Sequence, residues 1–168
     1  MNDAVLPDVM DQLAGIAPGS RLFELRRQRP EVVRHLQGSD EAILAPANDG
    51  GLSRAERAAA ALRIAILLGD EALEQHYRAL LVGLDASDTL LRTAEAGPRT
   101  VTDPRWAAIL AHVDRVTTSP DSATRADLDE LLGAGLSAHA LVSLSQLIAY
   151  VNFQSRVLAG LRMLGDAE

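Results

Sequence analysis

The chain has 168 residues, about the size of one domain, and it is long enough to bury a core without disulfide or metal support. Its net charge is −7 at pH 7, so we do not expect the broad basic face that non-specific nucleic-acid binding needs. The chain contains no cysteine, and all of its 16 Lys or Arg residues are arginine. These absences exclude a cysteine nucleophile, thiolate metal ligands, disulfides and a lysine Schiff base.

The composition favours helices. Hydrophobic residues make up 48% of the chain but aromatic residues only 3%, so alanine and leucine must fill the core. No run of β-branched and aromatic residues alternates with period two. We therefore predict an all-α fold, with residues 1–168 as a single domain. The first residues lack the features of a signal peptide, and no stretch is apolar enough to span a membrane, so we expect a soluble cytoplasmic protein.

Residues 1–45 are predicted to form an N-terminal helical arm. A first helix is expected over 3–14, and Ser20 is expected to cap a second helix that continues up to Pro30. That proline begins a third helix, because it supplies a helical φ and lacks only an amide that the first turn does not need. A short helical turn is expected over 39–44.

The arm also carries a local group of basic side chains. They are Arg26, Arg27, Arg29, Arg34 and His35. They form either a site for an anion or acidic partner, or a solvated face that pairs with the nearby carboxylates of Glu24, Glu31 and Asp40. The sequence Pro-Ala-Asn-Asp-Gly-Gly over 46–51 is the clearest loop, and it separates the arm from the helical core over 53–164.

The stretch over 53–81 is predicted to form a helical hairpin. Ser53 and Glu56 fit a capping box, and the alanine-rich run that follows has a high helix propensity. Gly69 breaks this run, and Asp70 offers an N-cap for the second helix. The inward stripes are predicted at Ala58, Leu62, Ala65, Ile66 and Leu68 in the first helix, and at Leu73, His76, Tyr77, Leu80 and Leu81 in the second.

The remaining helices are marked by their caps. A short helix is predicted over 85–94, and Asp103, followed by proline, marks the start of the next. Thr124 and Asp127 resemble a capping box for another helix. Ser137 caps the last and longest helix, which is predicted to run to about residue 164. The glycines over 133–135 make a second hairpin with the preceding helix.

The hairpin over 53–81 resembles the carboxymuconolactone decarboxylase and AhpD-like alkylhydroperoxidase family. In that family a glutamate-bearing helix leads into a Cys-x-x-Cys pair, and a histidine follows four residues after the second cysteine. Anchored on His76, the two cysteine positions fall on Gly69 and Ala72, and Glu56 is one residue out of register with the family's glutamate. The resemblance implies an AhpD-like helical bundle from which the redox centre is missing.

The C-terminal region is similar to the peroxidase-related branch of the same family. It has a Gly-Leu-Ser turn over 135–137, an Asn-Phe pair over 152–153, and Arg156 shortly after that pair. The resemblance, which covers more than half of the chain, implies a homo-oligomer, a trimer or a hexamer or else a dimer. A cysteine-bearing paralogue is a further expected partner.

His76 and Glu56 are weak candidates for catalysis, and no residue is assigned a catalytic role. The family's histidine relays protons for the peroxidatic thiol, but no thiol is present here. His76 is then either an acid–base group beside Glu56, or a histidine satisfied by that carboxylate or by a backbone carbonyl. Four further polar side chains are expected to line a pocket or to form a buried network that fixes helix register: Tyr77, Tyr150, Asn152 and Arg156.

No metal or cofactor is predicted. The four histidines lie far apart, without a second histidine at helical i+3 or i+4 spacing, and there is no Gly-rich phosphate loop. Three hypotheses follow for function. The protein is a non-catalytic oligomeric structural or interaction partner without thiol peroxidase activity, an acid–base enzyme of the lactone decarboxylase kind, or a small-molecule binding protein with a pocket near His76. In the second, Arg156 or Arg63 would bind a substrate carboxylate.

Overall fold

The computed structural model of the protein describes residues 7–165. Within this range the chain forms helices and no strand, so the prediction of an all-α fold is confirmed. The α-helices are α1 (Val9–Ala14), α2 (Arg21–Arg27), α3 (Pro30–Leu44), α4 (Arg54–Leu68), α5 (Glu71–Gly83), α6 (Asp88–Ala96), α7 (Pro104–Thr118), α8 (Arg125–Gly133) and α9 (Ala138–Gly165), with 3-10 turns η1 (Pro98–Thr100) and η2 (Pro120–Ser122).

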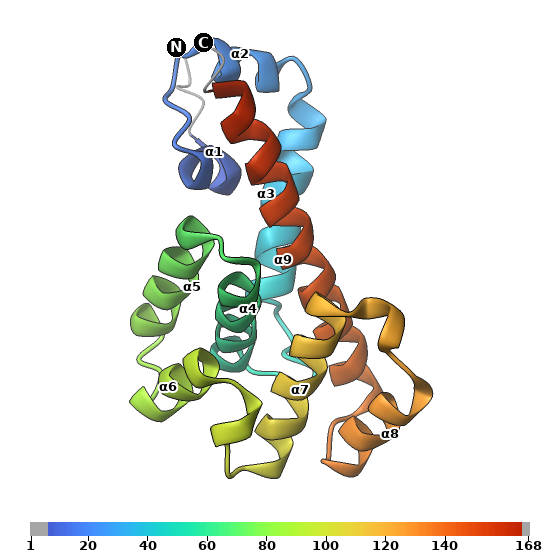
Figure 1. The fold of residues 1–168 in the computed structure, drawn as a ribbon. Helices are drawn as coiled ribbons and strands as arrows, with labels where there is room; N and C mark the ends of the chain where they lie inside the picture. Colours follow the sequence, from blue (N-terminus) through green and yellow to red (C-terminus); the bar gives the residue numbers. More distant parts are fainter. Residues whose placement is uncertain (1–6, 166–168) are drawn as a thin grey trace.

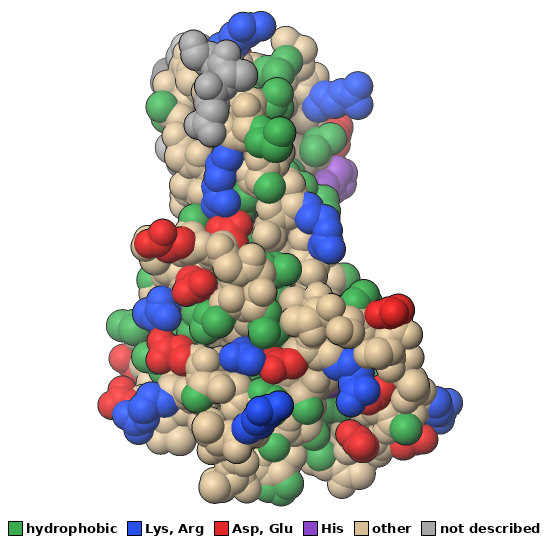
Figure 2. Space-filling model, in the orientation of Figure 1, with side chains coloured by type: hydrophobic (Ala, Val, Ile, Leu, Met, Phe, Trp, Pro, Cys, Tyr) green, Lys and Arg blue, Asp and Glu red, His purple; other side chains and the backbone are tan. Residues whose placement is uncertain are grey.

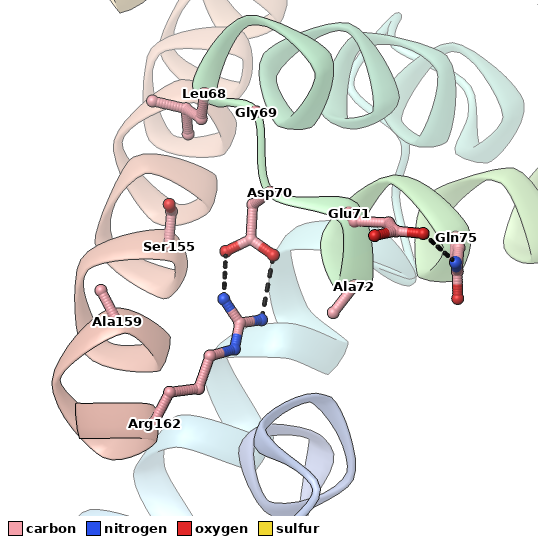
Figure 3. A pocket seen from close by; sticks show the side chains of 9 residues that line it. All are labelled: Leu68, Gly69, Asp70, Glu71, Ala72, Gln75, Ser155, Ala159 and Arg162. Atoms are coloured by element: carbon pink, nitrogen blue, oxygen red, sulfur yellow. Dashed lines mark hydrogen bonds and ion pairs between the residues drawn. The ribbon is translucent and has the colours of Figure 1, made fainter. Parts of the chain in front are cut away.

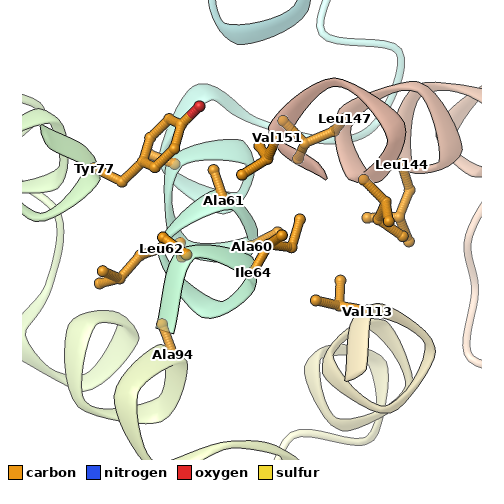
Figure 4. Packing of buried hydrophobic residues seen from close by; sticks show 14 of the residues in the cluster. Ala60, Ala61, Leu62, Ile64, Tyr77, Ala94, Val113, Leu144, Leu147 and Val151 are labelled. Carbon is orange, nitrogen blue, oxygen red and sulfur yellow. The ribbon is translucent and has the colours of Figure 1, made fainter. Parts of the chain in front are cut away.

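Helix α4 lies at the centre of the wide part of the molecule, where α5, α6, α7 and α9 all pack against it (Figures 1 and 4). Its alanine run over 58–61 is fully buried. Small side chains allow neighbouring helices to approach closely, and larger residues from those helices, such as Val113 and Leu144, fill the space around the run. The alanine-rich composition is therefore used for close helix packing.

Helix α9 joins the two ends of the molecule. It starts beside α7 and α8 in the wide part and runs into the narrow part, where α1, α2 and α3 lie (Figure 1). Both α1 and α3 pack against it. The division into an arm over 1–45 and a core over 53–164 stays a prediction, since α9 contributes to both.

The caps that the sequence indicates are present. The Ser53 hydroxyl accepts from the Glu56 amide at 3.3 Å, and the Glu56 carboxylate accepts from the Ser53 amide at 2.8 Å. Gly69 ends α4 in the left-handed region with φ of 65°, and Asp70 caps α5 by accepting from the Leu73 amide. These local interactions place the hairpin bend where the sequence predicts it.

Two predicted helix starts are wrong. The first helix begins at Val9, because the Asp8 carboxylate caps it at the Asp11 amide; residues 3–6 of the predicted helix lie outside the described residues. Helix α6 begins at Asp88 instead of residue 85, because the Ser87 hydroxyl is its N-cap. In both cases a second capping residue lies a few positions inside the expected start.

Two further boundaries in the arm differ from the prediction. Helix α2 ends at Arg27, because the residue before Pro30 is pushed out of the helical region by the proline ring. The expected turn over 39–44 is the continuation of α3, which stays helical through Gly38. A single glycine costs a helix only about 1 kcal/mol, which tertiary contacts with α9 offset.

The basic residues of the arm pair with local carboxylates. Arg26 bonds to Asp8 at 2.9 Å and to Asp11, and Arg27 bonds to Asp11 at 2.5 Å. Farther along, Arg34 and His35 both face Glu31 on the exposed side of α3. Among the described residues, Glu31 is thus one of the partners that the sequence suggests. Buried carboxylates of α1 pair with Arg26 and Arg27 and tie α1 to α2.

Candidate functional site

The bend of the α4–α5 hairpin opens into a pocket of about 730 Å³, here called the hairpin pocket (Figure 3). Gly69 and Ala72, which the sequence resemblance predicts at the family's two cysteine positions, both line it. The complete lining is Leu68, Gly69, Asp70, Glu71, Ala72, Gln75, Ser155, Ala159 and Arg162. The two predicted positions therefore lie on one open cavity, and neither side chain carries a reactive group.

The charged groups of the hairpin pocket already have partners. Asp70 and Arg162 form a bidentate ion pair, with distances of 3.0 and 3.1 Å between the guanidinium nitrogens and the carboxylate oxygens. The pair joins the bend to the C-terminal part of α9 (Figure 3). The Asp70 side chain is only 5% exposed, so this pair is partly desolvated. Gln75 donates to Glu71 at 3.1 Å. The pocket thus has a fixed polar wall and no thiol.

His76 lies nearly two turns beyond the bend, outside the lining of the hairpin pocket. Its ring packs edge-to-face on the ring of Tyr77, with centroids 5.0 Å apart. It is half-buried, and this burial lowers the pKa of His76, although the nearby Asp40 carboxylate acts in the opposite direction. His76 is consequently held in its neutral form and faces a carboxylate from the arm.

A buried hydrogen-bond chain runs through the same region. Tyr77 donates to Gln154 Oε1, Gln154 Nε2 donates to the Tyr150 hydroxyl at 3.1 Å, and Tyr150 donates to Asp40 Oδ1 at 2.9 Å. All donors therefore point toward Asp40, which also receives a longer bond of 3.4 Å from Gln154. The chain, here called the Asp40 network, connects α3, α5 and α9.

Burial dominates the electrostatics of the Asp40 network. It raises the pKa of Asp40, although the hydrogen bond from Tyr150 and the nearby His76 lower it. The pKa of Tyr77 and that of Tyr150 are both raised, chiefly by burial and then by the negative charge of Asp40. Both tyrosines therefore stay neutral hydrogen-bond donors, and the titratable members of the region are Asp40 and His76.

The structure separates the four polar side chains predicted to act together. Tyr77 and Tyr150 belong to the Asp40 network, but Asn152 and Arg156 lie on another side of α9. Arg156 donates to the Asn152 carbonyl at 2.9 Å, and the Asn152 amide donates to a carbonyl of its own helix. Residues 150 and 154 share one face of a helix, and 152 and 156 share another.

Glu56 does not reach His76. Its carboxylate completes the capping box with Ser53 and forms an ion pair with Arg105 of α7. The same arginine donates to the Gly51 carbonyl at 2.7 Å, so Glu56 helps to hold the loop before α4. Its contacts are those of a structural residue.

Sequence reasoning missed Gln154 and Asp40 as members of this site. Gln154 had a usable signal: it is a polar residue four positions from Tyr150 on the face of α9 that otherwise carries leucine and valine. Asp40 had none, because it lies in the arm, 110 positions from its partner Tyr150. Only the packing of α3 on α9 brings the two together.

A second cavity of about 780 Å³ lies between α3 and α9, here called the α3/α9 groove. Its lining is mostly apolar: Glu31, Val32, His35, Leu36, Ser39, Ala42, Ile43, Gln146, Ala149, Tyr150 and Phe153. Val32 is 52% exposed and Phe153 44% exposed. The narrow part of the molecule shows other apolar side chains on its surface as well (Figure 2).

Two features are absent from residues 7–165. No group of three or more His, Cys, Asp or Glu side chains in that range could hold a metal ion. None of the helices described there is both long and apolar enough to cross a bilayer.

These features define an AhpD-like helical fold. The structure is similar to the crystal structure of an uncharacterized peroxidase-related protein from Silicibacter sp. TM1040. The TM-score is 0.70, and the alignment covers 94% of this chain and 87% of that chain at 14% identity. No protein-family model matches the sequence, and no curated protein does so either. The predicted AhpD-like fold is thus confirmed at the level of structure.

Proposed function

We propose that this protein is a cysteine-less AhpD-like protein without thiol peroxidase activity, which acts as an oligomeric structural or interaction partner. The observation that carries the proposal is the hairpin pocket: Gly69 and Ala72 line it, and the whole chain contains no cysteine. A cytoplasmic location, expected from the sequence, is part of the proposal.

The chain lacks the groups that thiol-dependent peroxidase chemistry needs. Thiol-dependent peroxide reduction needs a thiolate that attacks the peroxide and is oxidised to a sulfenic acid, and a second thiol that resolves it. His76 supplies a neutral base, but the chain contains no cysteine whose thiol it could activate. A base without a nucleophile cannot begin this reaction.

The surface supports association. The α3/α9 groove exposes large apolar side chains, and Val142 of α9 is exposed to 56%. Contiguous exposed apolar surface of this kind is typical of protein contact sites. Further copies of this chain, as a trimer, hexamer or dimer, are the first candidate partners, and a cysteine-bearing paralogue is the second.

An acid–base enzyme is a second candidate, and one observation favours it. Burial moves the pKa of Asp40 upward and that of His76 downward, and each group acts electrostatically on the other. Titratable groups with perturbed pKa values are typical of sites that exchange protons. Because Glu56 is engaged by Arg105, the partner of His76 in such an enzyme would be Asp40.

The test is a hydroperoxide consumption assay with a dithiol reductant, using the wild-type protein and His76→Ala. We expect both proteins to consume hydroperoxide at the rate of the protein-free control. Turnover above that rate by the wild type, lost in His76→Ala, would show that the proposal is wrong. A metabolite-dependent reaction that needs both Asp40 and His76 would favour the acid–base enzyme.

A further inference from the structure

We propose that the bond between Asp49 and Gly50 is a modification site, where the chain forms isoaspartate by itself once the surrounding loop opens. Both residues lie in the loop over 45–53, here called the junction loop, which joins α3 to α4. The modification is a covalent change of the chain, separate from the proposed function. It is indicated by the residues of the junction loop and by the contacts that hold the loop closed.

The reaction needs only these two residues and water. The Gly50 amide nitrogen attacks Cγ of Asp49, an N–Cγ bond forms, and the hydroxyl of the protonated carboxyl leaves with the amide proton as water. Water then opens the resulting succinimide ring at either carbonyl, which gives back aspartate or leaves the main chain running through Cγ as isoaspartate. The composition of the chain is the same before and after. Glycine favours the attack, because it has no Cβ to hinder the approach of its nitrogen.

In the closed loop both reacting groups are held in other hydrogen bonds. The Gly50 amide donates to Asn48 Oδ1 at 3.0 Å, and Asp49 Oδ1 accepts from the Gly51 amide at 2.9 Å. The attack requires that the nitrogen lose its proton and that the carboxyl turn toward it, so both bonds must break first. The closed loop therefore slows the reaction, although Asn48 and Asp49 are both exposed to water.

Arg57 of α4 holds the same loop from the inside. Its side chain is buried, and its guanidinium donates to the Asp49 carbonyl at 2.8 Å and to the carbonyls of Leu52 and Ile43. The Leu52 amide also donates to the Asp49 carbonyl, at 3.1 Å. These bonds fix the peptide that must rotate before the ring can close. Local opening of the junction loop, controlled by Arg57, therefore sets the rate of modification.

The packing around Gly50 makes the modified loop different from the original one. A Cβ placed on Gly50 would lie 2.9 Å from His139 Nε2, so the loop has little room at this point. Isoaspartate adds a methylene to the main chain between residues 49 and 50, and it turns the Asp49 carbonyl into a free carboxylate. The modified loop must therefore move away from His139 or from Arg57. The covalent change keeps a record that the loop has opened.

The test measures isoaspartate in the full chain during incubation at pH 7 and 37 °C. Enzymatic methylation of the free carboxylate counts the modified sites, and peptide mapping locates them. Isoaspartate at position 49 leaves the peptide mass unchanged, whereas deamidation of Asn48 changes it. We expect the folded wild type to react at least about tenfold more slowly than the wild type in urea, because only the open loop reacts. Asp49→Glu is expected to give no product at position 49, because its longer side chain disfavours the ring.

Two variants open the loop in different ways. Asn48→Ala removes the acceptor of the Gly50 amide at an exposed position, so we expect modification about twofold to tenfold faster than in the wild type. Arg57→Met removes the bonds to the loop carbonyls, and we expect a rise of about tenfold or more. Arg63→Met is the matched control, because this arginine bonds to Asp114 and to the Glu95 carbonyl, away from the loop. We expect it to react at the wild-type rate.

Each outcome decides for or against the modification site. A folded wild type that reacts as fast as the chain in urea overturns the proposal, and so does product found only at Asn48. Wild-type rates in Asn48→Ala, which leaves the core intact, also overturn it, even if Arg57→Met fails to fold. Circular dichroism checks the fold of every variant. Hydroperoxide turnover, which tests the proposed function, is independent of these rates.

Discussion

Replacing Tyr77 with phenylalanine removes one hydroxyl from a fully buried site and leaves the shape of the core nearly unchanged. In the wild type this hydroxyl donates to Gln154 Oε1, so the variant leaves a buried acceptor without its donor. An unsatisfied buried polar atom costs about 1–3 kcal/mol. For a chain of this length, about 2 kcal/mol corresponds to a fall in melting temperature of about 4–8 °C.

A double-mutant cycle tests whether that loss comes from the Asp40 network. Gln154→Leu by itself is expected to destabilise the protein by about 1–3 kcal/mol relative to the wild type. It leaves the Tyr77 hydroxyl unsatisfied and removes a donor to Tyr150. The double variant replaces both partners with apolar groups, so we expect it to be more stable than the sum predicts by about 1 kcal/mol or more.

The assay is urea unfolding at pH 7 and 25 °C, followed by circular dichroism. Thr118→Val is the control, because its hydroxyl bonds a carbonyl of its own helix at an exposed position, and we expect a change of no more than about 0.5 kcal/mol. Wild-type stability for Tyr77→Phe, or strictly additive effects in the cycle, would refute the reasoning.

Three other predictions concern single positions. Arg57→Met leaves two carbonyls of the loop before α4 and the Ile43 carbonyl of α3 without their buried donor, so we expect a loss of about 2–4 kcal/mol in urea unfolding and faster proteolysis of that loop. Gly97→Ala is expected to destabilise more than Gly69→Ala in thermal unfolding: both glycines have positive φ, but a Cβ at Gly97 would lie 2.7 Å from the Arg63 guanidinium, whereas at Gly69 it meets open space. The pKa of His76 is lowered in the folded state, so the folded protein disfavours the protonated imidazole. The contribution of His76 to the free energy of unfolding is therefore fully present above pH 6.5 and is lost as the pH falls through its folded pKa. His76→Gln should therefore lose less stability than the wild type between pH 7 and pH 5, and equal slopes in urea titrations would contradict this.

The sequence predicts the helical architecture well where the signals are local. The capping box of Ser53 and Glu56, the left-handed Gly69 and the proline at the start of α3 act over one to four residues, so they are readable without tertiary information. Boundaries fail where two capping residues compete, as at Asp8 and Ser87, because packing then chooses between them.

What the sequence by itself determined is the all-α class, the position of the hairpin bend, and the absence of any thiol at Gly69 and Ala72. These follow from composition and from short-range interactions. Only the tertiary structure decided that Asp40 joins Tyr150, and that Glu56 meets Arg105 instead of His76. The reason is physical: helix periodicity fixes which residues share a face, but the partner of that face is chosen by the packing of whole helices, which brings together residues about 50 to 110 positions apart.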